Sequence, residues 1–149
     1  MSLKARLSDD MKQALRAGDK PRLSTLRMAL AAIQQREVDE RTELDDPQVM
    51  AVLEKMIKQR RESAAQYRTG EREELALQEE SEIGFLTGYL PEPLSEQELD
   101  ELIVRVIGDT GAQSMRDMGK VMSQVKRLAE GRADMGAVSA KVKTRLAGG

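Results

Sequence analysis

The sequence predicts an all-α protein, and three observations lead to that fold class. Aromatic residues make up only 2% of the chain, against many Leu, Ala, Met, Glu, Lys and Arg. Helices accommodate this composition better than sheets, because straight-chain residues lose little rotamer freedom in a helix. Apolar residues recur at spacings of three and four, and capping residues stand in front of several of these stretches. We expect about seven helices, four before Leu90 and three after Ser95.

Four helices are expected in the first 90 residues. Their predicted starts are capping or first-turn residues, and their predicted ends are mostly glycines or polar segments. The helices should run from Ser2 to Gly18, from Asp19 to the acidic segment Glu37–Asp46, from Asp46 to about Arg68, and from about Glu71 to Tyr89. The acidic segment could suggest a cation site. Without an EF-hand pattern, we interpret it as a solvated loop whose last acids cap the next helix.

Two prolines mark the internal boundary of the chain. The stretch LPEPL, residues 90–94, contains Pro91 and Pro93, which fix their own φ and favour extended conformations before them. We therefore predict an N-terminal four-helix bundle-like domain at residues 1–90. A Pro-containing linker joins it to a small three-helix C-terminal domain at residues 91–149.

Local signals define the three helices of the C-terminal domain. Ser95 with Glu98 forms one capping box, and Ser114 with Asp117 resembles a second, in which Asp replaces Glu or Gln. Gly131 is a candidate C′ glycine of the middle helix, and Asp134 is placed to cap the last helix.

The stretch from Ser114 to Gly136 is the first candidate for function, because its helix has two chemically different faces. The apolar arc consists of Met118, Val121, Met122, Val125, Leu128 and Ala129, and the opposite arc of Arg116, Lys120, Ser123 and Arg127. Residues 91–113 carry a net charge of −5 and residues 114–149 a net charge of +5. A basic end on an acidic chain indicates phosphate or an acidic protein face as partner, although surface helices with snorkelling lysines would look the same.

Gly119 is unusual, because a glycine inside a helix costs about 1 kcal/mol relative to alanine. It indicates a close approach of another backbone, either from RNA or, as we favour, from a neighbouring helix. A second basic cluster, at Lys55, Lys58, Arg60 and Arg61, is interrupted by acids and is interpreted as a solvated helix face.

Several classes of function are disfavoured by composition and motifs. The chain has no histidine and no cysteine, so the commonest zinc ligand, the commonest general base and thiol chemistry are all missing. No phosphate-binding loop, dinucleotide fingerprint or nucleophile elbow is present. The net charge of −2 argues against bulk coating of nucleic acid. We expect no catalytic residues, no cofactor and no metal.

No signal peptide is recognisable at the amino terminus, and no apolar run approaches the roughly 20 residues that span a bilayer. We therefore expect a cytoplasmic protein without a membrane partner.

The motifs resemble those of a known family. The stretch KQRRESAAQYRTGEREELALQEESEIGFLTGYLPEPLSEQEL, followed by DMGKVM and GRAD, is similar to the bacterial YqeY proteins over essentially the whole chain. The resemblance implies an α-helical fold whose last domain is similar to the tail of the GatB subunit of the glutamyl-tRNA(Gln)/aspartyl-tRNA(Asn) amidotransferase. In GatB that tail helps to hold tRNA, while the chemistry takes place elsewhere. Gly119, Lys120, Met122, Gly131, Arg132 and Asp134 occupy the motif positions of the tail. Met135 and Ser139 depart from the glycine or proline and the asparagine that many relatives have.

Three hypotheses about function follow from the residues and the resemblance. The first is a non-catalytic tRNA-binding accessory protein. The second is a protein-interaction module that docks its basic C-terminal end on a translation partner such as an amidotransferase or an aminoacyl-tRNA synthetase. The third is a component of a carbon–nitrogen ligase with glutamine as amido donor, as the family association implies. For the first we predict that tRNA contacts Arg116, Gly119, Lys120, Lys126, Arg127, Arg132, Lys141 and Arg145.

Overall fold

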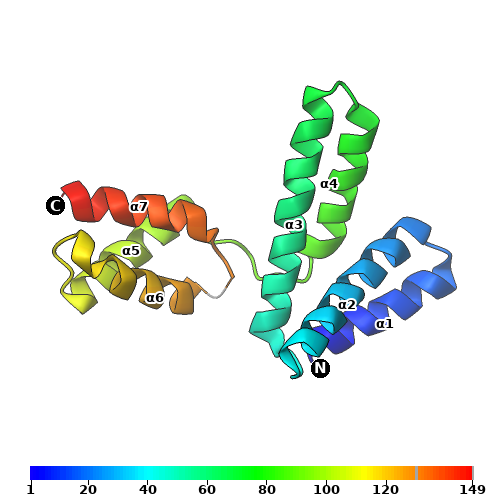
Figure 1. Cartoon of the computed structure of the whole chain (residues 1–149), viewed down its shortest axis with the longest axis horizontal. Helices are drawn as coiled ribbons and strands as arrows, with labels where there is room; N and C mark the ends of the chain where they lie inside the picture. Colours follow the sequence, from blue (N-terminus) through cyan, green and yellow to red (C-terminus); the bar gives the residue numbers. More distant parts are fainter. Residues whose placement is uncertain (130, 149) are drawn as a thin grey trace. The chain divides into compact units, whose positions relative to one another are not determined.

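The computed structural model describes residues 1–129 and 131–148, which form seven α-helices, one short 3₁₀ helix and no strand. The all-α class and the seven helices are thus confirmed. The described residues divide into two compact units, Met1–Leu90 and Pro91–Gly149. Each has its own hydrophobic core. Figure 1 shows helices α1–α4 in the first unit and α5–α7 in the second.

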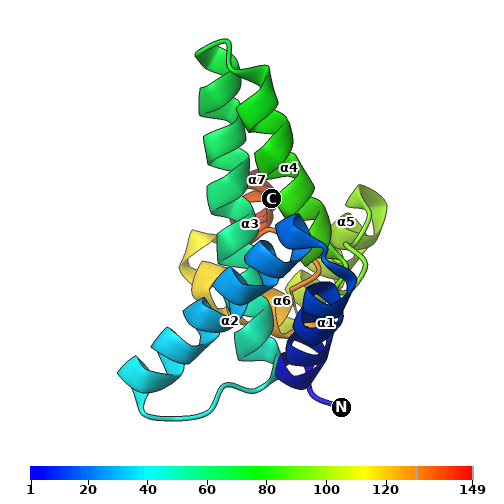
Figure 2. The ribbon, with the colours of Figure 1, turned by 90° about the vertical axis from the view of Figure 1, so that its right-hand side faces the viewer.

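The first unit consists of two helical hairpins. Helices α1 (Leu3–Ala17) and α2 (Lys20–Glu40) form one, and α3 (Asp46–Thr69) and α4 (Glu73–Thr87) form the other. Figure 2 shows the α3–α4 hairpin crossing the α1–α2 hairpin and extending beyond it. The unit therefore differs from a bundle in which four helices are aligned along their full lengths. The crossing region holds the core, which includes Leu7, Leu26, Ile33, Leu53 and Leu86.

The expected acidic loop is shorter than predicted, because its first four residues are helical. Helix α2 continues to Glu40, and Arg41 ends it with a positive φ of 55°. Glu37 lies inside the last turn, where its carboxylate accepts hydrogen bonds from Lys4 Nζ at 2.8 Å and from the backbone N–H of Leu44 at 2.9 Å. Asp45 caps α3 in a capping box with Gln48, as expected for the last acids. Glu37 therefore ties α1 to the α2–α3 connection.

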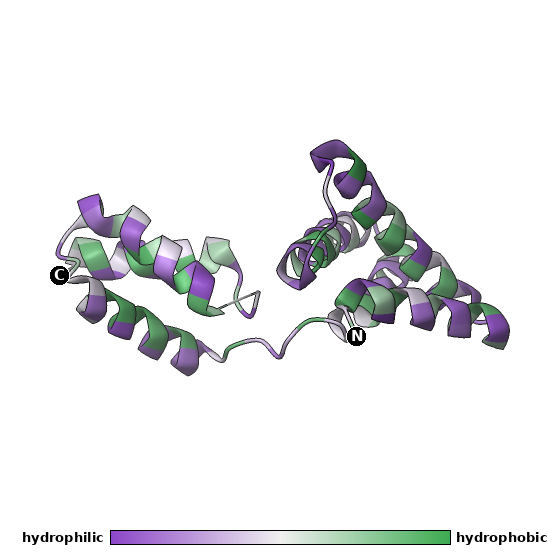
Figure 3. Cartoon of the chain, turned by 90° about the horizontal axis from the view of Figure 1, so that it is seen from below, coloured by the Kyte–Doolittle hydropathy of each residue, from purple (hydrophilic) through white to green (hydrophobic). Residues whose placement is uncertain are grey.

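The second unit contains α5 (Glu96–Thr110), the 3₁₀ helix η1 (Met115–Asp117), α6 (Met118–Ala129) and α7 (Met135–Gly148). Helix α6 packs against both of the other helices, and α5 and α7 run in the same direction, opposite to α6 (Figure 1). Hydrophobic and hydrophilic residues alternate around the helices (Figure 3). The core is built from branched aliphatic side chains, among them Ile103, Val121, Val125, Val138 and Val142.

The carboxylate of Glu37 predicts an acid-sensitive contribution to stability. The hydrogen bond from Lys4, followed by the one from Leu44, lowers the pKa of Glu37 below its ordinary value of about 4.5. The stabilisation is therefore present at neutral pH and is lost as the pH falls through the lowered pKa. Glu37→Gln should lower the unfolding temperature at pH 7 by a few degrees and reduce the further drop seen on acidification to pH 3.

Thermal unfolding followed by circular dichroism at both pH values measures these changes. Glu43→Gln is the matched control, since the Glu43 side chain forms no ion pair with a described residue. Equal effects of the two substitutions would contradict the role given to Glu37.

Candidate functional site

The start of α6 is built by the capping pattern read from the sequence. Ser114 and Asp117 form a reciprocal capping box around the 3₁₀ turn η1. Asp117 Oδ2 accepts hydrogen bonds from the backbone N–H groups of Gln113 and Ser114, and these bonds lower the pKa of Asp117. After α6, Gly131 has the positive φ of 76° expected for a C′ glycine, and Asp134 Oδ2 accepts from Ala137 N. Glu130, the last residue of the helix predicted from the sequence, lies outside the described residues.

Helix α6 has one packed face and one cationic face. Val121, Val125 and Ala129 are fully buried against the rest of the unit. The cationic face, as we call Arg116, Lys120, Lys126 and Arg127, is exposed. Its contacts are weak or local: Lys120 Nζ donates to Thr110 O at 3.4 Å, and Arg127 donates to Gln124 Oε1 at 2.7 Å. Leu128, expected on the apolar arc, is 40% exposed because it lies at the edge of the packed face. The assignment of the cationic face to RNA contacts stays a prediction.

Gly119 lies on the exposed side of α6 and is not a packing glycine. A Cβ atom built on it would meet no atom within 4 Å. The close approach of a neighbouring helix, which we favoured from the sequence, is therefore wrong for the described residues.

The other three predicted contact residues lie apart from the cationic face. Arg132 follows α6 in the turn, and its Nε donates to Glu92 O at 2.8 Å. The backbone N–H of Leu94 donates in turn to Arg132 O, also at 2.8 Å. Arg132 thus holds the proline-containing segment before α5 against the α6–α7 turn. The sequence gives no signal for this pairing, since 40 residues separate the two partners.

Lys141 is engaged in an ion pair across the unit. Its Nζ lies 2.8 Å from Asp100 Oδ1 and 3.9 Å from Glu96 Oε2, both on α5. The hydrogen bond to Asp100 raises the pKa of Lys141, because it stabilises the charged ammonium group. Lys141 thus joins α7 to α5, and its expected contact with RNA stays a prediction.

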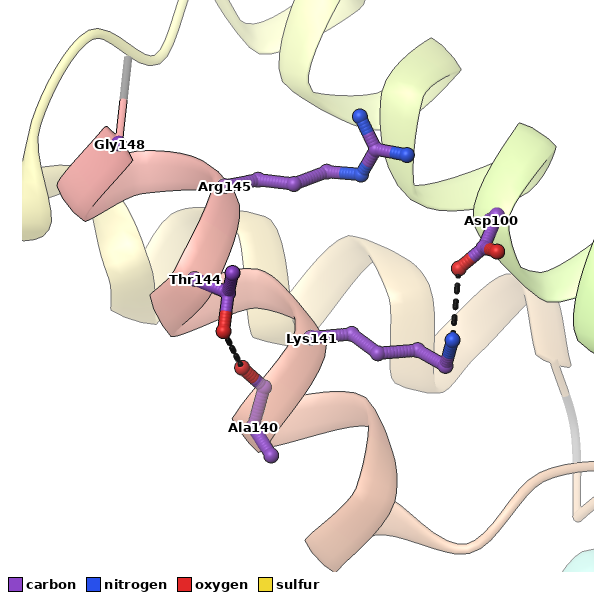
Figure 4. A pocket seen from close by; sticks show the side chains of 6 residues that line it. All are labelled: Asp100, Ala140, Lys141, Thr144, Arg145 and Gly148. Atoms are coloured by element: carbon purple, nitrogen blue, oxygen red, sulfur yellow. Dashed lines mark hydrogen bonds and ion pairs between the residues drawn. The ribbon is translucent and has the colours of Figure 1, made fainter.

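Arg145 lines a shallow groove between α5 and α7. The groove has a volume of about 610 Å³, and its lining residues are Asp100, Ala140, Lys141, Thr144, Arg145 and Gly148. A hollow of about 310 Å³ shares Asp100 and Arg145 with it and extends along α5, where Glu101, Val104 and Arg105 complete the lining. Figure 4 shows Lys141 and Arg145 reaching from α7 toward α5, with Lys141 directed at Asp100. We call the two hollows together the α5–α7 groove. Sequence reasoning missed Asp100 and Val104, which have no motif.

The shifted titratable groups of the second unit all have structural partners. Glu98 closes the capping box with Ser95, and the backbone N–H of Ser95 is the main cause of its lowered pKa. Asp117 caps η1, and Lys141 pairs with Asp100. Among residues 1–129 and 131–148 there is no group of three or more His, Cys, Asp or Glu side chains that could hold a metal ion. None of the described helices has the length and apolarity needed to cross a membrane.

The open surroundings of Gly119 give a direct prediction. Gly119→Ala should raise the free energy of unfolding by up to about 1 kcal/mol, because alanine loses less backbone entropy and the added methyl group meets no neighbour. Urea unfolding of the parent and the variant measures the difference. A loss of stability would show that another part of the chain approaches this glycine.

The position of Arg132 gives a second prediction. Arg132→Ala removes the hydrogen bond to Glu92 O, worth about 1 kcal/mol. Amide hydrogen exchange at Leu94 should then become about five-fold faster, since the segment opens more often. The Leu99 amide, inside the first turn of α5, is the internal control and should keep its rate. Unchanged exchange at Leu94 would mean that Arg132 does not hold the segment.

Comparison with known proteins identifies relatives over most of the chain. Residues 4–146 match the model of the Yqey-like protein family. A protein named altered inheritance of mitochondria protein 41, mitochondrial, from Pyrenophora tritici-repentis is 31% identical over 141 residues, which is 93% of this chain and 77% of that protein.

Proteins with the same name from Vanderwaltozyma polyspora and Kluyveromyces lactis are also similar. The first is 33% identical over 75% of this chain, and the second 35% identical over 70% of it. The chain spans 64% and 58% of the length of these two relatives.

These relatives correct three expectations from the sequence. They are fungal proteins named as mitochondrial, so the description as a bacterial, amidotransferase-related tRNA-binding protein is wrong. These names do not test the expected translation partners or the ligase association. The cytoplasmic expectation is overturned by the same names. The functional expectation rested on the resemblance of the C-terminal domain to the GatB tail, and the relatives matched over most of the chain carry no such name. No catalytic activity is shown by these comparisons. With nearly its whole length matched, the chain belongs to the YqeY family.

Proposed function

We propose that this protein is a non-catalytic binding protein whose second unit receives a helical segment of another protein in the α5–α7 groove. The observation that carries the proposal is the surface of this groove. It combines an apolar side chain, Val104, that is 49% exposed with a guanidinium, Arg145, that forms no ion pair with a described residue.

The shape of the groove favours a helix as the bound element. Helices α5 and α7 run in the same direction and both pack on α6, and the hollow lined by residues of both helices is open rather than enclosed. Amphipathic helices bind in such hollows through side chains spaced one turn apart. The contact area is small, so affinity for a single isolated segment should be modest.

A role without catalysis agrees with how the titratable side chains are used. Catalytic acids and bases usually combine a shifted pKa with a position in a cleft. In the groove the one group with a shifted pKa is Lys141, and its cause is the structural ion pair with Asp100. The names of these relatives concern the inheritance of mitochondria and name no reaction. Both observations support a binding role for this chain.

A phage-displayed library of single-helix peptides tests the proposal on the full-length protein. Peptides that bind should shift the backbone amide resonances of residues around Val104 and Thr144 in two-dimensional NMR spectra. Residues at the far end of the α3–α4 hairpin, such as Ala65, should not shift. Binders that shift only the first unit or the cationic face of α6, or the absence of any binder, would overturn the proposal.

A further inference from the structure

Residues of α5 and α7 face each other across the α5–α7 groove at two successive positions, one helical turn apart, which we call the first and the second level. At the first level, Lys141 on α7 pairs with Asp100 on α5 at 2.8 Å. One helical turn further along each helix stand Arg145 and Val104, and both line the second hollow. The two helices run in the same direction, and each residue of the second level follows its first-level counterpart by four positions. Arg145 is therefore expected to face Val104 as Lys141 faces Asp100.

The second level lacks the acid that the first level has. Its cation is Arg145, but the residue one turn after Asp100 is Val104, which cannot accept a hydrogen bond from a guanidinium. Asp100, which also lines the second hollow, is already paired with Lys141, and the neighbouring charged groups have partners of their own. Glu101 accepts from Gln97 Nε2 at 3.2 Å, and Arg105 lies 4.0 Å from Asp109 on its own helix. A cation without an ion-pair partner among the described residues and an exposed valine therefore line the same hollow.

We propose that a carboxylate of the bound segment completes this second level, so that the groove selects helices with an acidic residue three or four positions from an apolar one. This inference rests on the proposed function. The apolar side chain covers Val104, and the Asp or Glu accepts hydrogen bonds from the Arg145 guanidinium. Residues three or four apart lie on the same helix face, so one helix presents both groups to the groove. A guanidinium can donate two parallel hydrogen bonds to one carboxylate. This geometry makes the contact directional in addition to the attraction between the charges.

The first level limits how the segment lies. Lys141 is already paired with Asp100 and Glu96, so a second carboxylate there would compete with existing partners. An apolar side chain at that level would remove water from the Lys141–Asp100 ion pair and offer no hydrogen bond in exchange. Selection should therefore concentrate on the hollow around Val104 and Arg145.

The test introduces a carboxylate of the protein itself at the second level. In Val104→Glu, the new carboxylate stands opposite Arg145 and takes the place of the partner's acid. Binding of a selected acidic peptide, measured by fluorescence anisotropy with the full-length protein, should fall at least ten-fold, while the unfolding temperature stays the same or rises. Leu128→Glu is the matched control, because Leu128 is 40% exposed on α6 and the charge change is identical. It should bind like the parent.

A second pair of measurements isolates the carboxylate. The selected peptide and its Glu-to-Gln counterpart are compared on the parent and on Arg145→Gln. The parent should prefer the acidic peptide by about ten-fold, and Arg145→Gln should bind the two within about two-fold of each other. Normal binding of the acidic peptide by Val104→Glu, or equal binding of both peptides by the parent while NMR still places them in the groove, overturns the inference and leaves the proposed function standing. Peptides that shift resonances only outside the groove overturn the proposed function itself.

Other occupants give different results. Inorganic phosphate or RNA that displaces the peptide at micromolar concentration would show a free-anion site and overturn the inference. A second copy of the chain as occupant would appear as a dimer of the parent that Val104→Glu dissociates, and it would likewise overturn selection of another protein's helix.

Discussion

The second unit depends on the packing of one short helix against two others. Val121, Val125 and Ala129 of α6 are completely buried, and they contact a core to which both α5 and α7 contribute branched side chains. Because α6 is the common partner, α5 and α7 are brought alongside each other in the same direction without packing tightly on one another. The α5–α7 groove is a consequence of this arrangement. So is the exposure of the cationic face, which points away from the buried side of α6.

Some charged side chains of this protein form ion pairs between helices, whereas others have no such partner among the described residues. Lys4 with Glu37, Arg60 with Glu82 and Lys141 with Asp100 join separate helices by partly buried ion pairs. Such pairs add specificity of arrangement more than net stability, since desolvation offsets much of their attraction. The cations of α6 and Arg145 have no such partners among the described residues. The net charge of a segment therefore says little about which of its cations are available to a ligand.

The comparisons change the meaning of the motifs in the last third of the chain. Capping boxes, a C′ glycine and an apolar repeat are features of the helical fold. The stretch at residues 58–99, together with DMGKVM and GRAD, indicated the family, and the match over residues 4–146 confirms it. It did not identify the activity, because function depends on exposed residues that such motifs barely constrain.

Local interactions were the part of this structure that the sequence determined by itself. The capping boxes at Ser95 and Ser114, the positive φ at Gly131 and the apolar side of α6 that carries Val121 and Val125 each depend on residues within a few positions of one another. Only the tertiary structure decided which partners the predicted contact residues have within the chain. Arg132 meets Glu92 and Lys141 meets Asp100 across 40 and 41 residues, and Gly119 faces no neighbour. Helical periodicity states which side of a helix is apolar, but it does not state which side chains of another helix stand opposite. That opposition places Arg145 beside Val104, and it depends on how α5 and α7 pack on α6.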